Sequence, residues 1–418
     1  LLFDSPEEGQ TYVDRYKESI LADGSKVVAE RVNFAPQPQS SMSVIDQHTG
    51  YVKALIGGRG EKTASLTLNR ATETRRQPGS TFKIVSTYAP ALDAENMTLA
   101  TVFDNAPYNY TNGVPVNNWA GKNAYTGLTT IRQAIAGSIN VVAVKCLTEI
   151  TPRLGFEYAE DLGISTLYDD ENLDVRQPLA LGGITDGVVN IELCDAYATI
   201  ANGGKYNEAK FYSRIEDSEG KVIIDNTPEE KTVLKDSTAF LLTQAMMDVV
   251  KAGGTASDVS LGEMPIAGKT GTAQFAQDGI KYSDGYYLGT MVLYFPADEP
   301  KYTVLTAMFT RRGRGTTYYG AGLSGPVEQQ IVNYIYNRQR EWYGRVEETD
   351  DAHYARTVKG GDIAQIREAA GELMPRVVSE RRLGWGRTRV DSLGRVTVTP
   401  LADDPHTMPD VRGMGLKE

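Results

Sequence analysis

Cysteine and histidine are scarce in this chain of 418 residues. The two cysteines, Cys146 and Cys194, are too few for a disulfide framework or a thiolate zinc site, and their apolar surroundings favour buried free thiols. The three histidines, His48, His353 and His406, are scattered through polar or turn-like segments. This scarcity disfavours a histidine-centred triad and a three-histidine metal site. Any nucleophilic chemistry is expected to use another base, and lysine is the obvious candidate.

Long apolar runs and a positive charge balance are also lacking. No run of about 18 apolar residues occurs, so no membrane-spanning helix is predicted. The formal net charge of -11 disfavours nucleic acid as a partner, because phosphate binding requires a basic face. Hydrophobic residues still make up 41% of the chain, enough for cores of ordinary size in two or three domains. The first residues show no signal-peptide pattern, which leaves open a cytosolic protein or a fragment.

Turn residues and apolar spacing predict an early hairpin and a late group of strands, separated by helices. The strands are expected over 43–56 (a hairpin), 212–224 (a second hairpin), 264–276, 286–295 and 302–310, and the helices over 80–93, 128–162 (broken near Gly137 and Pro152), 237–250 and 326–337. The last helix has Val327, Ile331 and Ile335 as its expected apolar stripe. This order predicts an α+β domain in which both ends of the chain segment join one antiparallel sheet.

One segment places a serine and a lysine one helical turn apart. Gly79 permits a tight turn, Ser80 opens a helix, and Lys83 lies three residues on, on the same face. A lysine can activate a serine if burial and neighbouring cations lower its pKa, and a helix N-terminus suits an anionic intermediate. Alone, the pattern favours a capping serine with a surface lysine. The same spacing at Ser218 and Lys221 falls in a predicted hairpin turn, where catalysis is not expected.

Ser138-Ile-Asn140 lies at an interruption between helical segments. A hydroxyl and an amide two residues apart can face one cleft, where the first relays a proton and the second binds a substrate amide. The alternative is a helix cap, which both residue types favour.

Lys269-Thr270-Gly271-Thr272 lies on a predicted strand. It would carry positive charge and hydroxyls along a strand edge, and Gly271 would let a substrate approach the backbone. The alternatives are a mobile glycine-rich turn and a phosphate loop; the second lacks the preceding glycine pattern.

Together the three motifs, in this order, form the signature of the active-site serine penicillin-recognising enzymes, and the chain resembles the transpeptidase domain of penicillin-binding proteins. The resemblance is to class A members from about residue 29 to 274, on Gln37-Pro38-Gln39, Val44–Asp46, Gly57–Gly60, Asn69–Thr72 and Arg76–Lys83 besides the later motifs. Further on, Tyr287–Pro296 and Tyr318–Pro326 resemble class B members, and Met408–Leu416 resembles the opening of a PASTA module. The expected domains are a linker at 1–40, a transpeptidase domain at 41–340, a connecting region at 341–407 and a truncated PASTA-like module at 408–418.

The resemblance implies a five-stranded antiparallel sheet covered by helices on both faces, with an all-helical subdomain. It also implies a D,D-transpeptidase in which Ser80 is acylated by a peptidoglycan stem peptide. Lys83 would be the base, Ser138 the proton relay, and Asn140 a ligand of the substrate backbone. Lys269, Thr270 and Thr272 would hold the substrate carboxylate beside Gly271, and the backbone N–H groups of Ser80 and Thr272 would form the oxyanion hole.

The same resemblance implies β-lactams as covalent inhibitors, other cell-wall synthesis proteins as partners, and no metal or organic cofactor. It implies a location outside the cytoplasmic membrane, with an anchor in the full-length protein. Two alternatives stay open. One is a hydrolase, either a D,D-carboxypeptidase or a serine β-lactamase, although no glutamate for a class A β-lactamase can be assigned. The other is a non-catalytic scaffold that senses muropeptides or β-lactams.

Overall fold

A computed structural model describes residues 3–338, except 31, 33, 35, 61, 63, 64, 122, 123, 260–263, 276–280 and 313–316, together with the strand residues 361–362, 377–379, 385–390 and 396–400. The chain separates into two compact units, Leu1–Gln329 and Gln330–Glu418. Within the described residues, no helix is both long enough and apolar enough to cross a membrane.

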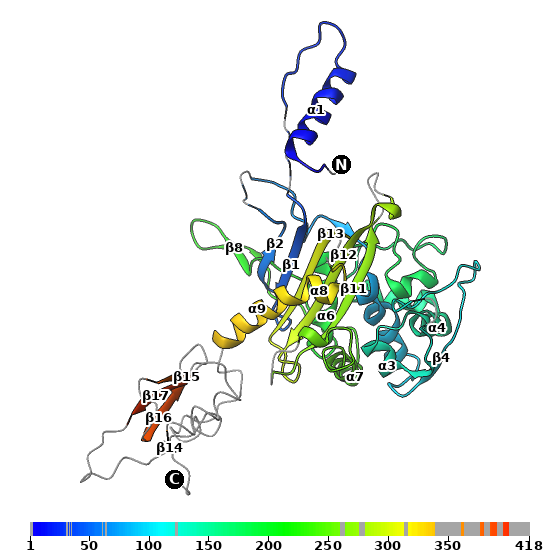
Figure 1. The fold of residues 1–418 in the computed structure, drawn as a ribbon, viewed down its shortest axis with the longest axis vertical. Helices are drawn as coiled ribbons and strands as arrows, with labels where there is room; N and C mark the ends of the chain where they lie inside the picture. The colour runs from blue at the N-terminus through cyan, green and yellow to red at the C-terminus, as the bar shows by residue number, and fades with distance from the viewer. Residues whose placement is uncertain are drawn as a thin grey trace. The chain divides into compact units, whose positions relative to one another are not determined.

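The first unit is built on a five-stranded antiparallel sheet with the order β11-β12-β13-β1-β2 (Figure 1). Its strands are β1 (Gln39–Ile45), β2 (Val52–Ile56), β11 (Ala267–Phe275), β12 (Tyr286–Phe295) and β13 (Tyr302–Arg311). The first and last of these strands pair, with Ser43 opposite Leu305. This confirms the predicted fold class, in which both ends of the domain supply one sheet. It also leaves β11, the strand with the Lys-Thr-Gly motif, at an edge.

Helices cover both faces of this sheet. Helix α6 (Asn190–Ala201) is almost wholly buried on one face, where Cys194 Sγ lies 3.6 Å from the Ser43 carbonyl oxygen. Helices α8 (Gly320–Leu323) and α9 (Gly325–Arg338) begin on the other face (Figure 1). There Ser324 Oγ donates to the Gly289 carbonyl oxygen at 2.9 Å, and Glu328 Oε1 accepts from Thr306 N at 2.9 Å.

A mainly helical part lies beside β11 and carries the first two motifs. Its helices are η1 (Gly79–Thr81), η2 (Ile84–Tyr88, a π-helix), α2 (Ala89–Asp93), α3 (Ile131–Ala136), α4 (Asn140–Ile150), α5 (Pro152–Asp161), η3 (Gln177–Leu181) and α7 (Asp236–Met247). The predicted breaks near Gly137 and Pro152 are confirmed. Thr130 begins α3 with a reciprocal capping box to Gln133, and Pro152 begins α5, where its missing N–H costs no hydrogen bond.

Short elements complete the first unit. They are the paired strands β3 (Arg75–Arg76) with β6 (Val188–Val189), β4 (Val102–Asn105) with β5 (Gly127–Thr130), β7 (Lys205–Tyr206) with β10 (Lys231–Thr232), and β8 (Arg214–Glu216) with β9 (Val222–Asp225), and the single turns η4 (Ser257–Val259) and η5 (Tyr282–Asp284). Both cysteines are buried and free, as predicted.

Two local features differ from the prediction. Helix α1 (Pro6–Ile20), in the segment predicted as a linker, was not predicted; Ser5 caps it by accepting from Glu8 N at 3.2 Å, a start signal that the polar composition concealed. The apolar stripe of α9 is also misplaced, because Val327 is 37% exposed whereas Glu328 and Val332 are buried. The buried face therefore includes a carboxyl group, which a stripe of apolar residues could not reveal.

The second unit contains a four-stranded sheet of its own, with the order β14-β16-β17-β15. Its strands are β14 (Gly361–Asp362), β15 (Val377–Ser379), β16 (Trp385–Val390) and β17 (Val396–Pro400). The PASTA-like segment at 408–418 lies outside the described residues.

Candidate active site

Ser80 lies at the start of the helical segment that runs to Asp93, and its position depends on Gly79. Gly79 has a φ of +59°, and a Cβ there would lie 2.8 Å from the Thr272 carbonyl oxygen. Only glycine fits both the left-handed backbone and this approach. The half-buried Ser80 therefore follows directly on a contact with β11.

Strand β11 meets the same turn through its own glycine. A Cβ on Gly271 would lie 2.4 Å from the Pro78 carbonyl oxygen, an approach that only glycine allows. Because side chains alternate along a strand, Lys269 points to the same face as Gly271. Two glycines from distant parts of the chain thus hold the Ser80 turn against the Lys-Thr-Gly strand.

Two fully buried lysines meet at Ser138. Lys83 Nζ lies 2.6 Å from the Ser138 carbonyl oxygen, 3.2 Å from Ser138 Oγ and 2.6 Å from Asn140 Oδ1. Lys269 Nζ donates to Ser138 Oγ at 2.8 Å and to the Thr270 carbonyl oxygen at 3.2 Å. Both lysine side chains are 0% exposed. The structure therefore brings four of the predicted residues, Lys83, Ser138, Asn140 and Lys269, into one cluster.

The electrostatics of this cluster are unusual for lysines. Burial lowers the pKa of Lys269 to about 7. Burial, and then the charge of Lys269, lower the pKa of Lys83 well below its ordinary value. Within the described residues neither lysine forms an ion pair with a carboxylate. Because the charge of the partner lysine adds to burial only for Lys83, the pair favours a neutral Lys83 beside a protonated Lys269.

Ser138 is presented by a strained turn between α3 and α4. Its φ is +52°, a left-handed conformation that costs a residue with a Cβ roughly 1 kcal/mol. The hydrogen bonds from both lysines and the preceding Gly137 hold the turn. The left-handed backbone at Ser138 thus places its hydroxyl between the amines of Lys83 and Lys269.

Asn140 begins α4 and is fixed by two neighbours that the sequence analysis missed. Its Nδ2 donates to the Asn117 carbonyl oxygen at 2.7 Å, and its backbone N donates to Asn118 Oδ1 at 3.0 Å. Asn118 also accepts from Val141 N at 3.2 Å and donates through Nδ2 to Ala124 O at 2.8 Å. The Asn-Asn pair before Trp119 was the available signal, but asparagine pairs in loops are too common to single out.

The two threonines of the third motif face the other side of β11. Thr270 Oγ1 lies 3.0 Å from Thr255 Oγ1. Thr272 Oγ1 accepts from Gly320 N at 3.2 Å, which leaves its own O–H group able to donate. Helix α8 can lie this close because Gly320 lacks a side chain; a Cβ there would be 2.4 Å from the Gly271 carbonyl oxygen.

Two exposed aromatic residues flank this arrangement and were also missed. Trp119 Nε1 donates to the Gly137 carbonyl oxygen at 2.8 Å, next to the strained serine. Its ring lies 6.2 Å from that of Tyr319, edge to face, and Tyr319 immediately precedes α8. Aromatic residues therefore connect the turn at Ser138 with the helix beside Thr272.

The second Ser-x-x-Lys match, Ser218 and Lys221, lies in an ordinary hairpin turn, as predicted. Asp217 N donates to the Lys221 carbonyl oxygen at 2.9 Å, and Gly220 adopts a φ of +82° in the exposed β8–β9 turn. Within the described residues no group of three or more His, Cys, Asp or Glu side chains is arranged to hold a metal ion.

A family comparison agrees with this geometry. Residues 41–333 match the sequence pattern of the penicillin binding protein transpeptidase domain. The chain belongs to this family. Relatives include penicillin-binding protein 1A of Clostridium acetobutylicum, 34% identical over 246 residues (57% of this chain, 30% of that protein). Penicillin-binding protein 1A/1B of Bacillus subtilis is 29% identical over 343 residues (81% of this chain, 36% of that protein). The chain thus spans about a third of the length of these relatives.

Solved structures show the same fold. The D,D-transpeptidase domain of a peptidoglycan glycosyltransferase from Eggerthella lenta superposes with a TM-score of 0.57 at 20% identity, covering 72% of this chain and 79% of that one. The transpeptidase domain of penicillin-binding protein 3 from Burkholderia pseudomallei gives a TM-score of 0.56 at 21% identity, covering 72% and 88%. At these identities the likeness establishes the fold alone.

Proposed function

We propose that this chain is a peptidoglycan D,D-transpeptidase that works through an acyl-enzyme on Ser80. Membership of the transpeptidase family supports a transpeptidase of cell-wall synthesis. The observation that carries the finer proposal is the pair of buried lysines on Ser138, one of which, Lys83, lies one helical turn from Ser80. A buried lysine that is kept neutral is the base that a chain with so few histidines needs.

In acylation, Ser80 Oγ forms a bond to the carbonyl carbon of the penultimate D-alanine of a stem peptide. Its proton passes to Lys83, whose amine lies on the same helical face. Collapse of the intermediate breaks the amide bond, and the proton passes through Ser138 to the amine of the departing D-alanine. Among the described residues Lys83 hydrogen-bonds to Ser138 and Asn140 and not to Ser80. This arrangement suits the later proton transfer, from Lys83 through Ser138 to the departing amine.

The contacts of Lys83 are compatible with a neutral amine. Two N–H groups suffice for the Ser138 carbonyl oxygen and Asn140 Oδ1, both at 2.6 Å. The longer contact of 3.2 Å can then run from the serine O–H to the amine nitrogen, while Lys269 donates to the same oxygen at 2.8 Å. With the hydrogen bonds in these directions, Ser138 can relay a proton between the protonated amine of Lys269 and the neutral amine of Lys83.

Transition-state stabilisation is assigned to the contact between the Ser80 turn and β11. The backbone N–H groups of Ser80 and Thr272 would form the oxyanion hole, since Gly79 lies against the backbone of Thr272. Loss of one such donor typically costs about 3 kcal/mol of transition-state stabilisation.

Substrate binding is assigned to the remaining motif residues. Asn140 would bind the stem-peptide backbone. Lys269 would supply positive potential near the terminal carboxylate, Thr270 and Thr272 would donate to it, and Gly271 leaves room for the substrate along the edge strand. In the second half-reaction an amine from a neighbouring stem attacks the acyl carbonyl and releases Ser80. β-Lactams would acylate Ser80 in the same way as the donor peptide.

This function places the active domain, residues 41–340, outside the cytoplasmic membrane, where its substrate lies. We propose that the full-length protein is anchored there and works with other cell-wall synthesis proteins. Residues 1–40 would serve as the linker, 341–407 as a connecting region and 408–418 as part of a PASTA-like module.

Covalent labelling with a fluorescent penicillin, followed by intact-mass analysis and peptide mapping, tests the nucleophile. One adduct on Ser80 is expected in the native chain and none in Ser80→Ala. Labelling that persists in Ser80→Ala contradicts the assignment.

Product analysis with a stem-peptide donor distinguishes the reactions that remain open. Acyl transfer to an added amine acceptor supports a transpeptidase. Transfer of the acyl group to water alone, at every acceptor concentration, indicates a carboxypeptidase. A single acylation without turnover indicates a scaffold.

A further inference from the structure

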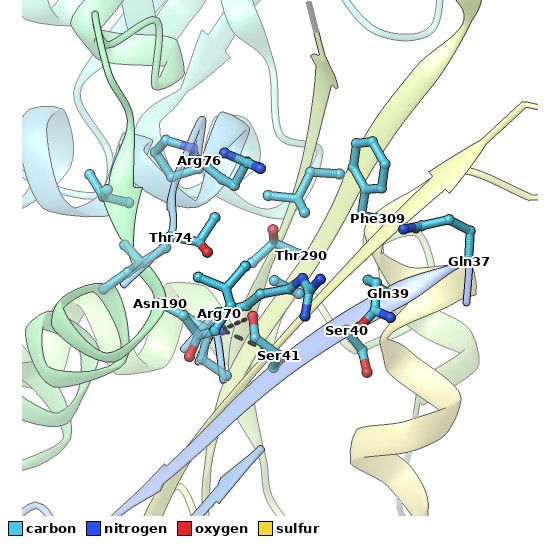
Figure 2. Close-up of a pocket in the computed structure, with 17 residues that line it drawn as sticks. Gln37, Gln39, Ser40, Ser41, Arg70, Thr74, Arg76, Asn190, Thr290 and Phe309 are labelled. Atoms are coloured by element: carbon cyan, nitrogen blue, oxygen red, sulfur yellow. Dashed lines mark hydrogen bonds between the residues drawn. The ribbon is translucent and has the colours of Figure 1, made fainter. Parts of the chain in front are cut away.

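A cavity of about 170 Å³ lies next to the turn that carries Ser80, because Pro78 of that turn lines it. Its other lining residues include Ser41 and Phe309 of the sheet and Arg70 of the segment that precedes the turn (Figure 2). Its apolar wall includes Leu193 of α6, Leu288 of β12, and Leu305, Ala307 and Phe309 of β13. None of the eight predicted site residues lines it. The cavity is therefore separate from the lysine–serine cluster.

Among the described residues, two arginines and no acidic residue line the cavity. Arg70 reaches into its middle, between Thr290 and Gln39 (Figure 2). Burial lowers the pKa of Arg70, and among the described residues its guanidinium makes a single long hydrogen bond, 3.4 Å to the Gly57 carbonyl oxygen. Within the described residues Arg70 has no carboxylate partner. Arg76, the second arginine, is already engaged, because it stacks on Phe275 at 4.8 Å.

Hydroxyl groups beside Arg70 can donate into the same space. Ser41 is 6% exposed, and its Oγ accepts from Asn190 Nδ2 at 3.1 Å, which leaves the serine O–H to donate. Thr290 is 2% exposed and lines the cavity from β12. A guanidinium with a nearby serine and threonine is a donor set that suits a carboxylate. Ser41 and Thr290 are buried, and Arg70 is partly buried, so an anion in this space would give these donors an acceptor where water has limited access.

Size and charge narrow the class of ligand. A cavity of about 150 Å³ lined by leucine and phenylalanine side chains accommodates benzene, so this cavity suits a ligand whose apolar part is about as large as a benzene ring. Because no described residue of the lining is acidic, an ammonium group is disfavoured, and so is a free amino acid such as the D-alanine that the reaction releases.

We propose that this cavity binds a small apolar monocarboxylate, with its carboxylate at Arg70 and its body against Leu288, Leu305 and Phe309. The site shares two walls with the catalytic machinery. Pro78 lines the cavity and its carbonyl oxygen touches Gly271, while Thr290 of the cavity pairs with Gly271 across the sheet. The ligand would thus lie directly behind the junction that positions Ser80.

Titration calorimetry with benzoate, benzyl alcohol and phenylalanine tests the proposal on the chain described here. Benzoate should bind one to one. Benzyl alcohol and phenylalanine should bind at least about tenfold more weakly, because the first lacks the charge and the second adds an ammonium without a partner. Equal affinity for benzoate and benzyl alcohol would overturn the assignment of Arg70.

Variants locate the binding. Arg70→Gln should weaken benzoate at least about tenfold, whereas Arg214→Gln, on the exposed hairpin, should leave it unchanged. Ala307→Leu should abolish binding by filling the cavity while both arginines remain, and it decides the question if Arg70→Gln does not fold. Circular dichroism reports the folding of each variant, and penicillin labelling also reports it for the variants that keep Ser80. Ser80→Ala should bind benzoate normally; loss of binding there, or full affinity in Ala307→Leu, would overturn the site.

Discussion

Gly271 and Pro78 approach each other so closely that a Cβ on the glycine would lie 2.4 Å from the proline carbonyl oxygen. The contact joins a strand of the sheet to the turn that carries Ser80, although the two lie nearly 200 positions apart in the sequence. A methyl group here must push β11 away from the helix start, because the clashing atom belongs to the backbone. The distance between Ser80 and the Thr272 N–H group depends on that junction.

Gly271→Ala should therefore slow acylation of Ser80 by a factor of about 100, the scale expected for a misplacement of about 1 Å in an active site. The rate of penicillin acylation, measured by stopped flow, checks this. The matched control is Gly220→Ala in the β8–β9 turn, where a Cβ meets no atom within 4 Å. It should cost about 1 kcal/mol of stability for its left-handed φ and leave acylation intact. A normal rate in Gly271→Ala would mean that the junction tolerates displacement.

Lys83→Met should lower the acylation rate by a factor of about 100 to 10,000, because it removes the proposed general base while keeping an unbranched side chain of similar length. It also leaves the Ser138 carbonyl oxygen and Asn140 Oδ1 without their donor, so the variant should unfold at a lower temperature than the native chain, by about 1–3 kcal/mol of stability. Single-turnover acylation and thermal melts measure the two effects. Lys221→Met, in the spurious Ser-x-x-Lys match, is the control and should change neither.

The fold was largely predictable because its apolar periods are regular and its motifs are local. The hairpin at β1–β2, the breaks of the helices at Gly137 and Pro152, and the late strands β12 and β13 all follow from spacing and turn residues within a few positions. Helix α1 was missed because its capping signal lies in a polar segment with little apolar periodicity. The predicted apolar stripe of α9 was wrong because Glu328 lies on the buried face, where it accepts a hydrogen bond from β13 that only the tertiary structure supplies.

The site was predictable in its members but not in its contacts. Three motifs indicated Ser80, Lys83, Ser138, Asn140 and Lys269, yet nothing in the spacing shows that both lysines meet at Ser138. Asn118 and Trp119 act through hydrogen bonds to residues 18 to 23 positions away, for which a lone sequence carries no signal. The cavity at Arg70 depends in the same way on five separate segments that only the folded chain brings together.

The pH dependence of acylation should follow the charge of the lysine pair. The reaction needs Lys83 neutral, so the rate should rise with pH through the pKa of Lys83, which burial and the charge of Lys269 lower. Removing that charge in Lys269→Met raises the pKa of Lys83, and the acid limb of the profile should move to higher pH. The plateau should also fall, because the positive potential for the substrate carboxylate is lost. Acylation rates between pH 5 and 10 test both effects. An acid limb at the same pH in Lys269→Met would show that another group controls it.

Asn118 should prove to be a positioning residue for Asn140. Its Oδ1 accepts from the first two N–H groups of α4, at 3.0 and 3.2 Å, and its Nδ2 donates to Asn105 Oδ1 at 2.9 Å. Asn118→Ala leaves these buried groups without partners and should cost about 2 kcal/mol in urea unfolding, together with a slower acylation.

Asn118→Asp keeps the acceptor at the helix N-terminus, where a negative charge is favoured, and loses only the donor. It should therefore recover most of the acylation rate while remaining less stable than the native chain, because the carboxylate then faces Asn105 Oδ1 without a proton between them. The comparison separates the two roles: a merely structural asparagine would lose rate and stability in parallel in both variants. Equal acylation rates in Asn118→Ala and the native chain would show that Asn140 holds its position without this neighbour.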